Sequence, residues 1–406
     1  MSHRAFSVLV SAAFACFAVS SPLLAQFGPP QPGFEPPERR EATDEERQTL
    51  AAAVERLGKT ANDVATGKAK VDAYLNLVWG GDGMFFREQR AWASELNKVR
   101  SIRYILSSKA DVNIEGDNAS GTIIVTVLVD NNETTLTMPA EFFRLSQGEG
   151  EQWLLAKEDF SLYSGSRTNV LIARGGRDRG WPIARAMDAV RRHVQRGLGH
   201  TVDRMVQVKV YETPYQAGFM VSPTIAAFDG YVTRHGESIR IDLSALPEDD
   251  AEMRAFLTRA FTTYTIHEIS GGREVPAWVS EGIGALAAER WAENADRNNL
   301  AAKVWLDEGN AFSRLRTISE MSGLDAFERS QARVVGQSFI GYISDEAGRD
   351  ARNEWFHAIA KGATPEEAAE ASLGKPLPEL WKGWTEYIAS NGWEDPDAVT
   401  PSDDEG

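Results

Sequence analysis

The sequence predicts an α+β protein, in which N-terminal helices and a curled, cone-like antiparallel sheet precede a mixed strand and helix region that ends in a helical subdomain. Three changes of hydrophobic period predict this order. Apolar residues recur at helical spacing up to about residue 98 and alternate from about residue 102 to 156. Beyond about residue 250 they return to helical spacing in long stretches, so helices are expected to form the C-terminal part.

The first domain is expected over residues 43–163. Thr43 and Glu46 form a capping-box pattern, which predicts a helix start. Glycines at residues 80–83 break the helical pattern, and a third helix is expected over residues 87–98. Predicted strands of this domain cover residues 102–106, 111–115, 122–129, 134–138, 142–145 and 153–156.

The second domain is expected over residues 164–392. An amphipathic helix is predicted over residues 181–198. Predicted strands cover residues 169–172, 206–211, 224–228, 231–232 and 239–243. Later helices are predicted over residues 300–306, 315–321, 333–343, 354–360, 366–373 and 377–388.

The segment from Thr258 to Trp291 contains the strongest chemical pattern. A helix is predicted to stop at Gly271, and a second helix is predicted to start at Pro276. One class of zinc peptidase site uses two histidines four residues apart on one helix, a glutamate after the first, and a carboxylate from the next helix. His267 is followed by a glutamate, but position 271 is glycine, so this pattern is incomplete in that register.

A second register comes from a resemblance to the peptidase MA-like, or gluzincin, family. Two segments carry it: residues 267–273, His-Glu-Ile-Ser-Gly-Gly-Arg, and residues 276–282, Pro-Ala-Trp-Val-Ser-Glu-Gly. The resemblance extends at the level of pattern over most of residues 165–390. It implies a zincin-like fold with a metal site between the two helices.

In that register the resemblance places the two zinc histidines at Arg259 and Thr263, the general-base glutamate at Ala260, and the third ligand at Glu281. Only Glu281 is retained, and a catalytic zinc ion normally takes three protein ligands. The resemblance therefore implies a replaced zinc motif and no cofactor. Arg259 would place a fixed cation near the metal position, with Glu281 as its expected partner.

Three hypotheses follow for function. The favoured one is a catalytically inactive protein that binds a peptide or an envelope component in the former site. The alternative is an active zinc metallopeptidase, with Zn²⁺ held by His267 and Glu281 and with Glu268 as the catalytic base. A third is a structural envelope protein whose groove is closed by side chains.

The first domain has a weaker resemblance, to the SnoaL-like (ketosteroid-isomerase-like) cone fold. It is carried by residues 153–160, Trp-Leu-Leu-Ala-Lys-Glu-Asp-Phe, and covers roughly residues 61–160. No catalytic dyad is evident there, and Asp72, Asp82 and Asp111 are expected to be surface carboxylates.

Composition and the termini predict an exported protein, either periplasmic or secreted. Residues 1–25 have the pattern of a signal peptide, 26–42 form a proline-rich linker, and 393–406 an acidic disordered tail. Cys16 is the only cysteine, so the mature chain would contain neither disulfides nor a catalytic thiol. The net charge of -16 argues against nucleic-acid partners, and no later stretch is apolar enough to span a membrane.

Overall fold

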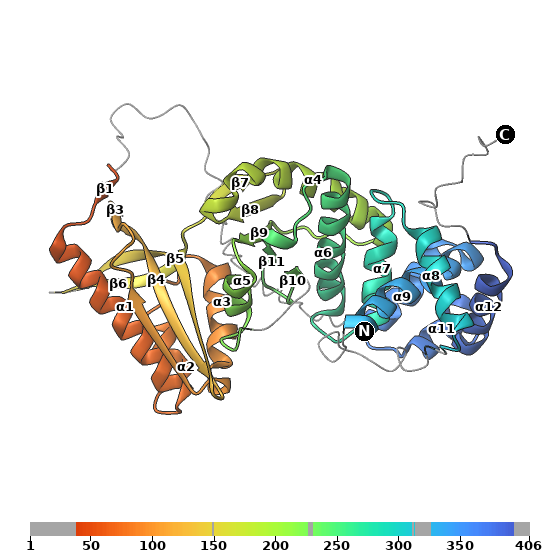
Figure 1. Ribbon diagram of the computed structural model, residues 1–406, viewed down its shortest axis with the longest axis horizontal. Coiled ribbons are helices and arrows are strands. Elements are labelled where there is room, and N and C mark those ends of the chain that lie inside the picture. The colour runs from red at the N-terminus through yellow and green to blue at the C-terminus, as the bar shows by residue number, and fades with distance from the viewer. Residues whose placement is uncertain (1–37, 148–149, 226–229, 311, 313–325, 394–406) are drawn as a thin grey trace, which may run out of the picture. The chain divides into compact units, whose positions relative to one another are not determined.

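The computed structural model describes residues 38–147, 150–225, 230–310, 312 and 326–393. The predicted signal peptide, most of the linker, nearly all of the acidic tail and the predicted helix over residues 315–321 lie outside these ranges. The described residues from Arg39 onward belong to one compact unit. Helices and both antiparallel and mixed sheets are present, which confirms the α+β class (Figure 1).

The first part of this unit is an antiparallel sheet covered by helices. Strand β4 pairs along its whole length with the longer strand β5, and α1 packs against β2. The elements are β1 (Arg40–Glu41), α1 (Asp44–Ala65), α2 (Val71–Leu75), α3 (Gly83–Ser94), β2 (Ser101–Leu106), β3 (Asn113–Glu115), β4 (Asn118–Val129), β5 (Asn132–Gln147) and β6 (Gly150–Glu158). The strand order is β1-β3-β4-β5-β6, with β2 also on β4.

Local signals explain most of these boundaries. The Thr43 hydroxyl accepts from the Glu46 amide and the Glu46 carboxylate accepts from the Thr43 amide, which confirms the predicted capping box. Two predictions were wrong in detail. The third helix starts earlier, at Gly83, because the Asp82 carboxylate caps its first turn. The strands predicted over 134–138 and 142–145 are one strand, β5, with a register shift after Glu141.

The second part begins with a mixed sheet, ordered β10-β11-β9-β8-β7, in which β8, β9 and β11 run parallel. Its elements are β7 (Ser161–Ser164), β8 (Thr168–Ile172), α4 (Gly180–Leu198), β9 (Val206–Tyr211), α5 (Pro214–Val221), β10 (Tyr231–Val232) and β11 (Ile239–Asp242). Strand β7 and helix α5 were not predicted from the sequence. Helix α5 is short, with Thr213 as its cap and Phe219 in the core of the first sheet. The strand predicted over 224–228 lies largely outside the described residues.

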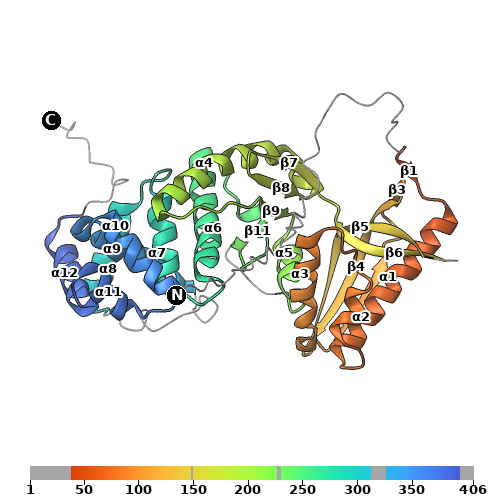
Figure 2. The same ribbon diagram turned by 180° about the vertical axis from the view of Figure 1, so that it is seen from behind.

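Helices account for most of the described residues from Asp250 onward, as predicted. Their bounds are α6 (Asp250–Ser270), α7 (Ala277–Ala288), α8 (Ala295–Asp307), α9 (Ala326–Ala347), α10 (Arg349–Ala360), α11 (Pro365–Leu373) and α12 (Leu377–Ser390). Contacts run in series from α4 to α6, from α6 to α7 and from α7 to α9, and Figure 2 shows this order from behind. Among the described helices, none has the length and hydropathy needed to cross a bilayer.

A fully buried cluster of charged residues joins the two sheets. The Nζ atom of Lys209 on β9 lies 2.6 Å from Oε2 of Glu88 on α3 and 2.9 Å from both carboxylate oxygens of Glu158 on β6. Arg240 on β11 lies 3.4 Å from Glu88 and donates to Glu237 at 2.6 Å. Burial opposes the ionisation of Glu88, but Arg240 and Lys209 outweigh it and lower its pKa to about 2.

The folded state should therefore lose stability in acid through Glu88. Its pKa is about 2 when folded and 4.5 ordinarily, so its contribution is complete above pH 4.5 and is lost as the pH falls toward 2. We expect the free energy of unfolding, measured by urea denaturation, to fall across this window. In the Glu88→Gln variant this fall in the free energy of unfolding should be smaller. The control Glu45→Gln, which changes an exposed carboxylate on α1, should show the same fall as the wild type. An unchanged slope in Glu88→Gln would contradict this account.

Candidate functional site

Helix α6 places the predicted site residues in the middle of the second part. Asp249 caps its start by accepting from the amides of Ala251 and Glu252. The helix is buried on most sides. It ends at Gly271, which adopts the left-handed conformation (φ 62°) and thereby confirms the predicted stop. Helix α7 starts directly after Pro276, which occupies its N-cap position, so the predicted start is confirmed.

The positions at which the family resemblance places the zinc motif lie together. The Thr263 hydroxyl donates to the Arg259 carbonyl at 3.1 Å and lies 3.4 Å from the Tyr231 hydroxyl on β10. Ala260 is 1% exposed and belongs to the core. The carboxylate of Glu281 on α7 is close enough to perturb both Arg259 and Tyr231 electrostatically. The arrangement is therefore one carboxylate beside an arginine and two hydroxyl groups.

The expected pairing of Arg259 with Glu281 is not the one observed. Glu281 accepts a hydrogen bond at 3.2 Å from Nε of Arg333 on α9, and its side chain is 11% exposed. Within the described part of the chain, Arg259 has no ion pair or hydrogen bond through its guanidinium. Burial lowers the pKa of Arg259, and the nearby Arg333 lowers it further. Tyr231 and Glu281 act in the opposite direction and raise the pKa of Arg259. Among the described residues, the site thus brings the guanidinium groups of Arg259 and Arg333 near the carboxylate of Glu281.

A close contact between glycines explains why Arg333 reaches this site. A Cβ atom on Gly282 would overlap the backbone of Gly336, and one on Gly336 would overlap the Trp278 carbonyl. Helices α7 and α9 therefore cross with backbones touching, as only glycine permits. Arg333 lies three residues before Gly336 and Glu281 directly before Gly282, so this crossing brings them together. Local spacing gave no sign of Arg333, which is 52 residues from Glu281.

The residues of the alternative metal site lie at the end of α6 and have other partners. The Glu268 carboxylate accepts from Nη2 of Arg204 at 2.7 Å and lies 3.6 Å from Nδ1 of His235. Burial and the neighbouring His235 lower the pKa of His267, against a raising effect of Glu268. Within the described residues no hydrogen bond links His267 to Glu281. Nor do these residues include a group of three or more histidines, cysteines or carboxylates placed to hold a metal ion.

Among known proteins, this chain is similar to solved structures but not to any protein-family model or curated sequence. No protein-family model matches the chain, and no curated protein matches its sequence significantly. Yeast LTA4 hydrolase in complex with bestatin is similar at 13% identity and a TM-score of 0.40, covering 73% of this chain and 52% of that one. Native yeast LTA4 hydrolase is similar at 10% identity and a TM-score of 0.36, covering 72% and 61%.

The M1 zinc metallopeptidase from Deinococcus radiodurans is similar at 13% identity and a TM-score of 0.33, covering 74% of this chain and 72% of that one. The chain thus spans about half to three fifths of the two yeast structures. At these identities the similarity is one of fold alone, and it assigns no role to any residue.

Proposed function

We propose that this protein binds a carboxylate-bearing peptide at Arg259 and Arg333 and does not hydrolyse it. The observation that carries the proposal is the partly buried guanidinium of Arg259, which has no ion-pair partner among the described residues. Burying an uncompensated charge costs free energy, and a bound carboxylate would offset that cost with charge-assisted hydrogen bonds. The Tyr231 hydroxyl, whose contact with the Thr263 hydroxyl is long at 3.4 Å, offers a further donor to the same ligand.

Burial and Glu281 raise the pKa of Tyr231, so its hydroxyl remains a donor at neutral pH. In this proposal the zinc motif has been replaced at Arg259, Ala260 and Thr263, and no metal is needed. The protein would be exported, and its partner would be a peptide or another envelope component. The first sheet would be a SnoaL-like domain over residues 43–163, followed by the binding domain over residues 164–392.

The Arg259→Gln variant should bind peptide at least about tenfold more weakly, because a charge-assisted hydrogen bond contributes about 1.5–3 kcal/mol. The probe is a mixture of N-acetylated tripeptides with free carboxyl termini, titrated calorimetrically into the purified protein. The same mixture with amidated C-termini lacks the carboxylate. It should therefore bind wild type as weakly as the free-acid peptides bind the Arg259→Gln variant. Arg185→Gln, which removes an exposed arginine on α4, is the charge-matched control and should bind normally.

Metal analysis of the same sample tests the alternative function. Stoichiometric zinc, together with peptide hydrolysis that is lost in His267→Ala, would establish an active metallopeptidase and overturn the proposal. Equal peptide affinity of Arg259→Gln and wild type would also overturn it.

A further inference from the structure

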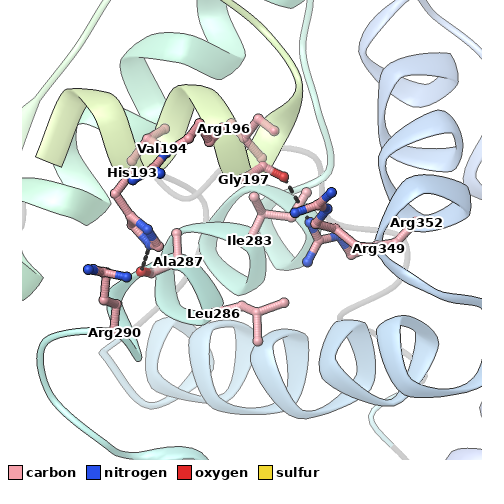
Figure 3. A pocket seen from close by; sticks show the side chains of 11 residues that line it. His193, Val194, Arg196, Gly197, Ile283, Leu286, Ala287, Arg290, Arg349 and Arg352 are labelled. Atoms are coloured by element: carbon pink, nitrogen blue, oxygen red, sulfur yellow. Dashed lines mark hydrogen bonds between the residues drawn. The ribbon is translucent and has the colours of Figure 1, made fainter.

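A second site lies between α4, α7 and α10, in a pocket of about 370 Å³ (Figure 3). Its most unusual feature is charge, since Arg196, Arg290, Arg349 and Arg352 all line it, together with His193. In Figure 3, His193 and Arg290 lie at one end and Arg349 and Arg352 at the other. Four arginines around one small pocket are unexpected in a chain with a net charge of -16.

The rest of the lining is apolar. Val194 and Leu198 contribute from α4, and Ile283, Leu286 and Ala287 contribute from α7. The three α7 positions recur at helical spacing, about 180° around the helix from Glu281, and Arg290 lies just beyond the end of the helix. The pocket is therefore separate from the site at Arg259 and uses the opposite face of the same helix.

The arginines differ in how strongly they are already engaged. Arg352 is structural, because it donates to the Gly197 carbonyl at 3.1 Å and to the Asn353 side chain at 2.7 Å. Arg349 has one ion pair, at 3.3 Å to Asp350, and both partners are mostly exposed. The guanidinium of Arg196 has one hydrogen bond, from Nε to the Arg192 carbonyl at 3.1 Å. In the described part of the chain, the pair of Arg349 with Asp350 is therefore the one ion pair that any of these four arginines forms with a carboxylate.

Arg290 is the least engaged of the four. Within the described residues its guanidinium has no hydrogen bond or ion pair and stacks on the Trp291 ring, 5.2 Å from its centroid. His193 does not add to the positive charge, because burial lowers its pKa and Arg290 and Arg196 lower it further, against a raising effect of the Ala287 carbonyl. Its Nε2 atom lies 2.8 Å from that carbonyl, so Nε2 carries the proton and Nδ1 is left as an acceptor.

We propose that this pocket binds a small amphiphilic anion, with a phosphate or carboxylate held by Arg290 and Arg196 and an apolar portion on Ile283 and Leu286. Arginine pairs suit both oxyanions, because the planar guanidinium donates two parallel hydrogen bonds. A volume of about 370 Å³ lies within the range of small-molecule sites. The anion would also relieve the repulsion among the arginines. This inference is independent of peptide binding at Arg259.

Calorimetric titration of the purified chain with octyl phosphate, below its micelle concentration, tests the proposal. We expect saturable 1:1 binding, and at least tenfold weaker binding of octanol and of inorganic phosphate, each of which lacks one half of the ligand. The double variant Arg196→Gln/Arg290→Gln should weaken octyl phosphate binding at least tenfold. Arg192→Gln, at an exposed arginine of α4 outside the pocket, is the matched control and should bind as wild type.

Absence of saturable binding, or equal affinity in the double variant and wild type, would overturn the proposal. Circular dichroism and thermal unfolding of the double variant separate loss of binding from loss of fold. Co-sedimentation with phosphatidate vesicles distinguishes the two sources of the anion. Sedimentation that the double variant loses identifies a lipid headgroup, and octyl phosphate binding without sedimentation identifies a soluble anion.

Discussion

The Lys209→Met variant should lower the free energy of unfolding by about 3–5 kcal/mol, the cost typical of removing one partner from a buried ion pair. Lys209 is 2% exposed and neutralises Glu88 and Glu158, both of which are buried. Methionine fills similar space but leaves two buried carboxylates with Arg240 as the nearest remaining cation. The measurement is urea denaturation at pH 7, followed by circular dichroism.

The control for this variant is Lys98→Met. Lys98 pairs with Glu95 at 3.3 Å, but its side chain is 57% exposed, so the change should be within about 0.5 kcal/mol. Combining Lys209→Met with Glu158→Gln should cost less than the sum of the two single changes, because removing both charges restores part of the balance. Additive costs, or a Lys209→Met variant as stable as Lys98→Met, would show that the cluster does not join the two sheets energetically.

The Gly336→Ala variant should lower the free energy of unfolding by about 2–3 kcal/mol, because the added methyl group overlaps backbone rather than a movable side chain. The Trp278 carbonyl occupies the position of the new Cβ atom, so α7 and α9 must separate. Separation would also displace Arg333 from Glu281. Peptide binding at Arg259 should therefore weaken in the same variant, a second measurement that does not depend on stability.

Gly341→Ala is the matched control on the same helix. Its added Cβ would have one neighbour, a Leu286 methyl at 3.9 Å, which is an ordinary contact. Replacing glycine with alanine in a compatible helix position usually stabilises by about 0.4–1 kcal/mol. If thermal unfolding shows the two variants to be equally stable, the close crossing of α7 and α9 is not what holds the site together.

Much of the local structure follows from the sequence. The capping box at Thr43, the helix end at Gly271 and the helix start at Pro276 are all confirmed. Each depends on residues only a few positions apart, whose hydrogen bonds and dihedral angles are local. The elements that were predicted wrongly also have local explanations. Helix α5 is only 8 residues long, and β5 continues through its register shift as one strand.

Charged residues inside predicted strands were a feature of the sequence that could have indicated the buried ion-pair cluster. Lys209 and Arg240 each lie between two apolar residues in strands β9 and β11 of the second sheet, and parallel strands are usually covered on both faces. A charge in such a strand must be buried with a partner, which predicts an ion pair even though it does not identify the partner.

The sequence by itself determined the class of fold and the two-helix segment around Gly271, whereas the replacement of the metal motif at Arg259, Ala260 and Thr263 stays a prediction. Only the tertiary structure decided which charges meet: Arg333 with Glu281, Lys209 with Glu88, and four arginines around one pocket. The physical reason is the distance along the chain between the residues that interact. Helix ends and turns are set by neighbours along the chain, whereas these pairs join residues 52 and 121 positions apart and depend on how backbones pack.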